Sequence, residues 1–186
     1  YDVEEGTNPG FLYQQNTMRD AIVAACNLNI FNNHSDKVVM ANLAQAVNVL
    51  QALILTEGDK MVKTPTYHVF DLFKTHQGGE LCYSYANNCQ AGGKIPMISQ
   101  SASVKDGVLT VTIANCSIDD DAHICSDIAG ENYQNIECRI LDNDVRDYND
   151  FDNCDKVTPK EHRAIWTEKG FEIDLPKCSV AVVTMR

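Results

Sequence analysis

Three amide side chains are the first residues in this sequence that could do chemistry. Asn42, Gln45 and Asn48 follow a short apolar run at residues 38–41, and their spacing of three suits one side of a helical turn or a tight loop. In α/β enzymes, a buried strand that ends in polar side chains delivers them to the mouth of a site. Amides suit a sugar, because each offers donors and an acceptor without a charge to desolvate. The alternative is that these amides only satisfy loop backbone.

Carboxylates form a second set of candidates. Glu4 and Glu5 could be a catalytic pair, but adjacent residues seldom present both side chains to one point. Glycosidic chemistry needs carboxylates that face each other across a bond. The Asp-rich runs at residues 119–121 and 142–155 lack the ligand spacing of a calcium loop. We expect solvated loops at all three places.

Histidine and tryptophan offer weaker signals. His34 could be a ligand or a base, but its place at a predicted helix end favours a cap that the helix dipole stabilises. His123 and Cys125 lack companions at zinc-ligand spacing, so we expect no metal site and no cofactor. Trp166 could stack on a sugar, but a single Trp in a strand is more typical of a core.

The sequence contains eight cysteines at irregular spacings and no Cys-x-x-Cys pair. Cys82 and Cys89 flank a predicted turn and are the best candidates for a disulfide. The cysteines in helical or strand-like apolar runs are expected to serve as small buried hydrophobes: Cys26, Cys116, Cys125, Cys138 and Cys178.

Size and charge place the chain among ordinary globular proteins. It has 186 residues, of which 44% are hydrophobic, enough for one large or two small cores. The net charge of −11 argues against nucleic acid or an anionic membrane as a partner. No segment approaches the roughly 20 apolar residues that span a bilayer, and we expect no signal peptide at Tyr1, which lacks a basic start and an apolar core after it. Because residue 1 is not Met, we expect a fragment or a processed product.

The first half has the pattern of an α/β protein. Apolar residues from Met18 to Leu28 recur at helical spacing after Thr17 as a cap, and this helix should end near residues 32–34. Thr64 and the following proline start a second helix, expected to end at the glycines 78 and 79. With a strand at 38–41 between them, these elements predict a piece of a parallel α/β architecture.

The second half changes to a period of two. Apolar residues alternate at 108–113, 171–175 and 178–184, and a turn at 105–107 precedes the first of these runs. This pattern predicts an antiparallel β domain. We therefore expect an α/β unit over residues 1–78 and a β domain over residues 79–186.

Four segments resemble a known family. They read GTNPGFLYQQ at 6–15, NIFNNH at 29–34, MANLAQAVNVL at 40–50 and TPTYHVF at 64–70. In this order they resemble the C-terminal part of the α-L-arabinofuranosidases of glycoside hydrolase family 51. The resemblance implies the last units of a (β/α)₈ TIM barrel, followed by a C-terminal antiparallel β-sandwich of jelly-roll type. Residues 38–41 would then be the eighth barrel strand, with the two helices as its outer partners.

The resemblance also implies a site. The family is retaining and uses two glutamates, an acid/base and a nucleophile, whose positions would lie upstream of Tyr1, so no catalytic residue is expected in this chain. Gln45 matches the glutamine that contacts arabinofuranose in the −1 subsite, whereas Asn42 and Asn48 match loop positions that support it. A retaining mechanism needs two carboxyl groups about 5 Å apart, and a complete barrel needs about 250 residues. We expect the chain alone to be inactive.

The implied function is release of terminal α-L-arabinofuranose from arabinan or arabinoxylan oligosaccharides. The implied partners are the missing N-terminal barrel part and further copies of the chain, because family members are often hexamers. The cytoplasm is favoured, with the periplasm and secretion left open. Two alternatives remain: a non-catalytic carbohydrate-binding or structural β-sandwich module, and a split enzyme that reassembles with an upstream chain.

Overall fold

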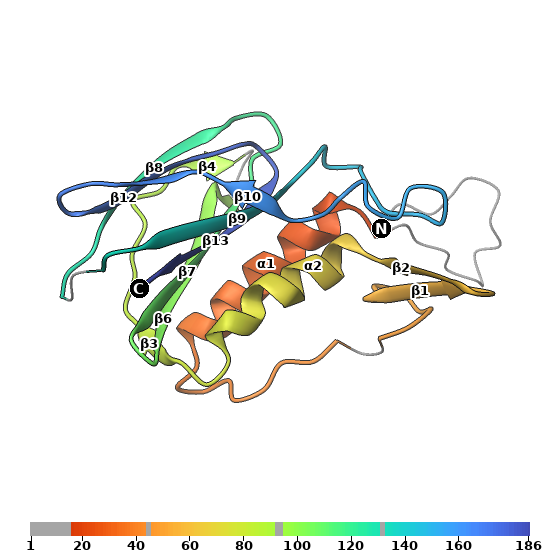
Figure 1. Ribbon diagram of the computed structural model, residues 1–186, viewed down its shortest axis with the longest axis horizontal. Helices are drawn as coiled ribbons and strands as arrows, with labels where there is room; N and C mark the ends of the chain where they lie inside the picture. Colours follow the sequence, from red (N-terminus) through yellow and green to blue (C-terminus); the bar gives the residue numbers. More distant parts are fainter. Residues whose placement is uncertain (1–15, 44–45, 92–94, 131–132) are drawn as a thin grey trace.

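A helical layer, a large six-stranded sheet, a small three-stranded sheet and two separate pairs of strands make up the computed structural model, which describes residues 16–43, 46–91, 95–130 and 133–186 (Figure 1). The helices in these ranges are α1 (Met18–Asn33), α2 (Pro65–Phe73) and the 3₁₀ helix η1 (Lys74–His76). The strands are β1 (Ile54–Glu57), β2 (Lys60–Lys63), β3 (Glu80–Cys82), β4 (Gln90–Ala91), β5 (Ile95–Pro96), β6 (Ile98–Lys105), β7 (Val108–Asn115), β8 (Ala122–Asp127), β9 (Ile136–Asp142), β10 (Lys160–His162), β11 (Ala164–Trp166), β12 (Gly170–Leu175) and β13 (Ser179–Met185). None of the helices in the described ranges is long and apolar enough to cross a membrane.

Two antiparallel sheets carry the second half of the chain. The larger has the order β10-β9-β13-β7-β6-β3, and the smaller has the order β11-β12-β8. The predicted turn between β6 and β7 is confirmed: Asp106 and Gly107 both have a positive φ, of 51° and 76°. Two successive left-handed residues make the type of turn that matches the twist of a hairpin. The prediction of an antiparallel β region is therefore confirmed.

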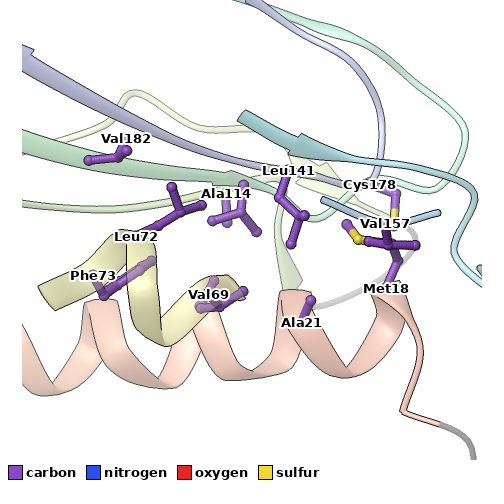
Figure 2. Close-up of a cluster of buried hydrophobic side chains, with 12 residues drawn as sticks. Met18, Ala21, Val69, Leu72, Phe73, Ala114, Leu141, Val157, Cys178 and Val182 are labelled. Carbon is purple, nitrogen blue, oxygen red and sulfur yellow. The ribbon is translucent and has the colours of Figure 1, made fainter. Parts of the chain in front are cut away.

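The large sheet is buried on both faces, and its central strand β13 shows this most clearly. Val180 and Val182 face α1 and α2, whereas Ala181 and Val183 face the small sheet. The two faces thus form two hydrophobic cores, one under the helices and one between the sheets. Figure 2 shows the first core, where side chains of both helices meet Leu141 and other sheet residues. Because this core joins α1 and α2 to the sheet, the two halves of the chain pack as one unit; the division at residue 78 stays a prediction.

The helix starts follow local sequence signals. The backbone N–H of Thr17 donates to the Asp20 carboxylate at 2.8 Å, and the Thr64 hydroxyl accepts the N–H of Tyr67 at 3.3 Å. Both satisfy groups that a helix N-terminus leaves unpaired. The predicted end of the second helix at glycines 78 and 79 is wrong, because the α-helix stops at Phe73 and η1 follows.

The expected strand at residues 38–41 is also wrong. This segment has no strand hydrogen bonds, and the side chains of Val39 and Met40 are 94% and 75% exposed. A β-strand needs a paired neighbour, and no described strand pairs with this segment. Instead, β1 and β2 form a separate hairpin after it. The described residues therefore contain no barrel strand, and the architecture is mostly β-sheet with few helices.

Candidate functional site

The three amides singled out in the sequence have different places in the structure. Gln45 lies outside the described residues. Asn42 is exposed on the segment that follows α1, and Asn48 lies close to the β1–β2 hairpin. Of the three, Asn42 and Asn48 lie in the part of the chain that the structure describes, and they belong to different segments.

Asn48 is hydrogen-bonded to strand β1 of this hairpin. Its amide nitrogen donates to the Thr56 hydroxyl at 2.8 Å, and its amide oxygen accepts the Thr56 backbone N–H at 2.7 Å. The residue itself has a φ of 52°, in the left-handed region that Asn tolerates better than most residues. With both ends of its amide engaged, Asn48 ties its own segment to strand β1.

We expect Asn48→Ala to lower the free energy of unfolding by about 1–2 kcal/mol. It removes two hydrogen bonds, and alanine tolerates a positive φ less well than asparagine does. Asn48→Gly is the matched control, since it removes the same hydrogen bonds but relieves the backbone, and should cost less. Thermal unfolding followed by circular dichroism measures both. Equal melting temperatures for Asn48→Ala and wild type would contradict this role.

Asn42 lines a groove between the helices and residues 41–43. The groove encloses about 440 Å³. Its walls are mainly apolar, and a polar corner is formed where Gln51 donates to the Asp20 carboxylate at 2.8 Å. The residues that line it from α1 include Val23, Asn27, Leu28 and Phe31, and Phe70 closes it from α2.

An exposed apolar surface continues from this groove. Val23 and Ile30 of α1 are 55% and 53% exposed, and Val39 and Met40 of the following segment are more exposed still. In Figure 1 this segment runs along the helical layer, away from the sheets. Several exposed apolar side chains on neighbouring segments are typical of surfaces that contact another protein part.

Most other sequence candidates have structural roles. His34 is the C-cap residue of α1, and its backbone N–H donates to Ile30 O. In the acidic region from 142, Lys160 pairs with Asp142 at 2.8 Å and Lys156 with Asp147 at 2.6 Å. Trp166 packs against the core between the sheets, which confirms its interpretation as a core residue. Glu4 and Glu5 lie outside the described residues.

The candidate disulfide between Cys82 and Cys89 does not form, because both are free thiols. Cys82 belongs to β3, whose backbone pairs with β6. Cys89 instead points its Sγ at Met97 Sδ, 3.2 Å away. Flanking a turn is therefore not enough, since the Cys82 thiol lies against the Glu80 carbonyl and the Cys89 thiol against Met97.

A buried polar network that was not predicted from the sequence lies under α1. Asn29 Oδ1 accepts hydrogen bonds from the hydroxyls of Ser101 and Thr112, at 2.8 and 2.7 Å. His76 extends the network, with Nδ1 2.7 Å from Ser103 Oγ and Nε2 3.0 Å from Thr112 Oγ1. Burial lowers the pKa of His76 from 6.5 to about 4. The signal that could have indicated this network is Asn29, a polar residue four positions after the buried Ala25.

Comparison with known proteins identifies the family. Residues 1–179 match the family described as the alpha-L-arabinofuranosidase C-terminal domain. This chain belongs to that family. It is 35% identical, over its whole length, to an intracellular exo-alpha-L-arabinofuranosidase of Bacteroides ovatus. The family resemblance noted in the sequence is therefore confirmed.

Solved structures agree with this family assignment. The GH51 arabinofuranosidase from Xanthomonas axonopodis pv. citri matches all of the chain with a TM-score of 0.91 and 38% identity. The alpha-L-arabinofuranosidase from Thermotoga maritima, solved with arabinose, matches 96% of it with a TM-score of 0.85 and 24% identity, a likeness of fold. The chain spans 38% of the Bacteroides relative and 39% of the Xanthomonas protein. This α-L-arabinofuranosidase C-terminal domain thus corresponds to well under half of its full-length relatives.

Proposed function

We propose that this chain is the C-terminal part of an α-L-arabinofuranosidase, a retaining glycoside hydrolase that releases terminal α-L-arabinofuranose from arabinan or arabinoxylan oligosaccharides. The observation that carries the proposal is the family match over residues 1–179, on a chain that spans 38% of its Bacteroides relative. The two catalytic glutamates belong to the upstream part of the enzyme. The chain contributes a sugar contact and the sheets that support the catalytic domain, and it needs no cofactor.

The exposed surface beside α1 supports a role for the upstream part as a partner. Val39 and Met40 are too exposed for residues of a packed domain, and the groove next to them is open. Burying Val39 and Met40 against an upstream barrel would supply about 1.5–3 kcal/mol for each side chain, and Val23 and Ile30, which are already about half buried, would each supply about half of that. The name of the Bacteroides relative favours the cytoplasm as the compartment, and assembly into hexamers is a further expectation.

A non-catalytic carbohydrate-binding module is the alternative. Its supporting observation is a pair of exposed tyrosines, Tyr83 and Tyr85, whose side chains are 94% and 79% exposed. Aromatic faces can stack on sugars. A binding module would retain arabinan or arabinoxylan oligosaccharides without any upstream partner, which distinguishes it from the enzyme reading.

The deciding experiment is hydrolysis of p-nitrophenyl α-L-arabinofuranoside. The 186-residue chain is assayed beside the same chain extended upstream through its own coding sequence. We expect activity only in the extended protein. Activity in the short chain would overturn the proposal and point to carboxylates within it, first Glu4 or Glu5. Oligosaccharide binding by the short chain, with no activity in either protein, would favour the binding module.

In the active extended protein, Gln45→Ala should lower kcat/KM. The loss should correspond to about 1–3 kcal/mol of transition-state stabilisation, because one buried hydrogen bond to the sugar is lost. The matched control is Gln51→Ala, an amide that contacts Asp20 rather than the proposed subsite. Initial rates with p-nitrophenyl α-L-arabinofuranoside provide the comparison. Unchanged kinetics in Gln45→Ala would remove this residue from the site.

A further inference from the structure

The outer face of the small sheet brings a histidine, a cysteine and a carboxylate together. His123 and Cys125 lie on β8, and Glu172 lies on β12 directly opposite Cys125. One ligand atom of each residue lies within 4.8 Å of those of the other two. Both β8 side chains are exposed, whereas the alternate residues Ala122 and Ile124 pack against the core. The sequence spacing of His123 and Cys125 alone did not indicate this group, because its third member comes from a strand that is distant in the sequence.

A fourth residue orients the histidine. Asp174 is directly opposite His123 in the pairing of β12 with β8, and its Oδ1 lies 2.7 Å from His123 Nδ1. A neutral imidazole that donates Nδ1–H to a carboxylate keeps the Nε2 lone pair free for another ligand. Metal-binding histidines usually have such a carboxylate or carbonyl behind them. Asp174 is therefore placed as the outer partner of His123.

We propose that His123, Cys125 and Glu172 bind a divalent transition metal ion of the zinc class. Thiolate and imidazole favour zinc over magnesium or calcium, which prefer oxygen ligands alone. Zinc bonds of about 2.0–2.3 Å place tetrahedral ligand atoms about 3.3–3.8 Å apart. Rotations of exposed side chains that shorten the present separations by about 1 Å would close the site. Three protein ligands leave the fourth position to water.

Binding would tie an edge strand to its neighbour. β8 is the last strand of the small sheet and pairs only with β12 within that sheet. A metal ion held by residues of both strands would cross-link them, and a ligand bound only by the folded state stabilises that state by mass action. The net charge of −11 also attracts cations to the surface.

The test is a titration of the reduced, metal-free 186-residue chain, purified without a histidine tag, with Co²⁺ as a spectroscopic probe. We expect a thiolate-to-cobalt charge-transfer band that Zn²⁺ removes by displacement. Cys125→Ser should abolish the band, and Asp174→Asn should weaken Co²⁺ binding about 10–100-fold. Matched controls are Cys154→Ser, another exposed cysteine, and Glu161→Gln, an exposed glutamate on β10; both should bind like wild type.

Three results would overturn the metal site. The first is a wild-type chain, shown to be folded by circular dichroism, that gives no charge-transfer band. The second is a band that survives in Cys125→Ser or is lost in Cys154→Ser, since the thiolate ligand would then lie elsewhere. An affinity that Glu172→Gln leaves unchanged would exclude the glutamate as the third ligand and with it the proposed set.

Two other cysteines, far apart in the sequence, lie close together between α1 and the large sheet. Cys26 of α1 and Cys116, which follows β7, are 90 positions apart, yet their Sγ atoms lie only 3.4 Å from each other. Both are half-buried free thiols. We infer that Cys26 and Cys116 form a disulfide when the chain meets a low-molecular-weight disulfide such as oxidised glutathione. The link would fasten α1 to the large sheet.

The reaction is an exchange in two steps. The Cys26 thiolate attacks one sulfur of oxidised glutathione and releases one glutathione thiolate. Cys116 then loses its proton and attacks Cys26 Sγ, which releases the second glutathione. The two cysteines are oxidised by two electrons, and the glutathione disulfide is reduced to two thiols. The hydrogen bond from Cys116 lowers the pKa of Cys26, which suits it as the first nucleophile.

Peptide mapping without reduction tests this link. After incubation with oxidised glutathione, we expect one cross-linked peptide pair that contains Cys26 and Cys116 and is absent in Cys26→Ser. The pair Cys82 and Cys89, suggested by sequence spacing, serves as the internal control and should stay unlinked. Only glutathionylated cysteines, or a link that joins another pair, would overturn the inference.

Discussion

Replacing Leu141 with alanine should lower the free energy of unfolding by about 2–5 kcal/mol. Leu141 is fully buried on the face of the large sheet that meets the helices, and Figure 2 shows it among the side chains of α1 and α2. The loss combines the transfer free energy of the removed carbons with the cost of the cavity that they leave. Because this core holds the helices on the sheet, the substitution should weaken the packing of α1 and α2 on it.

Leu81→Ala is the matched control for this prediction. Leu81 lies on the edge strand β3 and is 43% exposed, so its truncation should cost well under half as much. Urea denaturation followed by far-ultraviolet circular dichroism yields both values, and a common slope shows that both variants unfold to a similar state. Equal losses in the two variants would contradict the assignment of Leu141 to the shared core.

Acidification should destabilise the fold between about pH 6.5 and pH 4. Burial lowers the pKa of His76 to about 4 in the folded chain, against 6.5 for an ordinary histidine. In this interval the unfolded state binds a proton that the folded state does not, so the free energy of unfolding falls as the pH falls. The full difference corresponds to about 3 kcal/mol at most. Above pH 6.5 both states are neutral at this residue and the effect disappears.

The hydrogen bonds around His76 hold the buried, neutral ring in one tautomer. Thr112 donates its hydroxyl hydrogen to Asn29, so it can only accept from the imidazole, which places the ring hydrogen on Nε2. Ser103 then donates to Nδ1. A second ring proton would turn Nδ1 into a donor, so Ser103 would have to accept instead of donate. It would also place a positive charge on an imidazole that is buried away from water.

The variant His76→Gln should flatten this pH dependence. Urea denaturation at several values between pH 4 and pH 7.5 provides the measurement. His34→Gln, at the exposed end of α1, is the control and should keep the wild-type slope. Some slope will remain in His76→Gln, because burial also lowers the pKa of His68. An unchanged slope in His76→Gln would exclude His76 as a source of acid sensitivity.

Local sequence signals determined most of the regular elements. Thr17 and Thr64 mark the helix starts because capping depends on residues only three positions away. The turn at Asp106 and Gly107, and the alternating apolar pattern of the strands around it, are equally local. The ordered motifs between residues 6 and 70 also identified the family, although Gln45 itself stays a prediction.

Only the tertiary structure decided which distant residues meet. It placed β13 between β9 and β7, brought Glu172 beside Cys125, and put Cys26 against Cys116. It also left residues 38–41 without strand partners, although their apolar pattern is that of a strand. A local pattern specifies how a segment tends to fold and which side is apolar. Its neighbours depend on contacts across the whole chain, and a strand forms only where a paired neighbour is present.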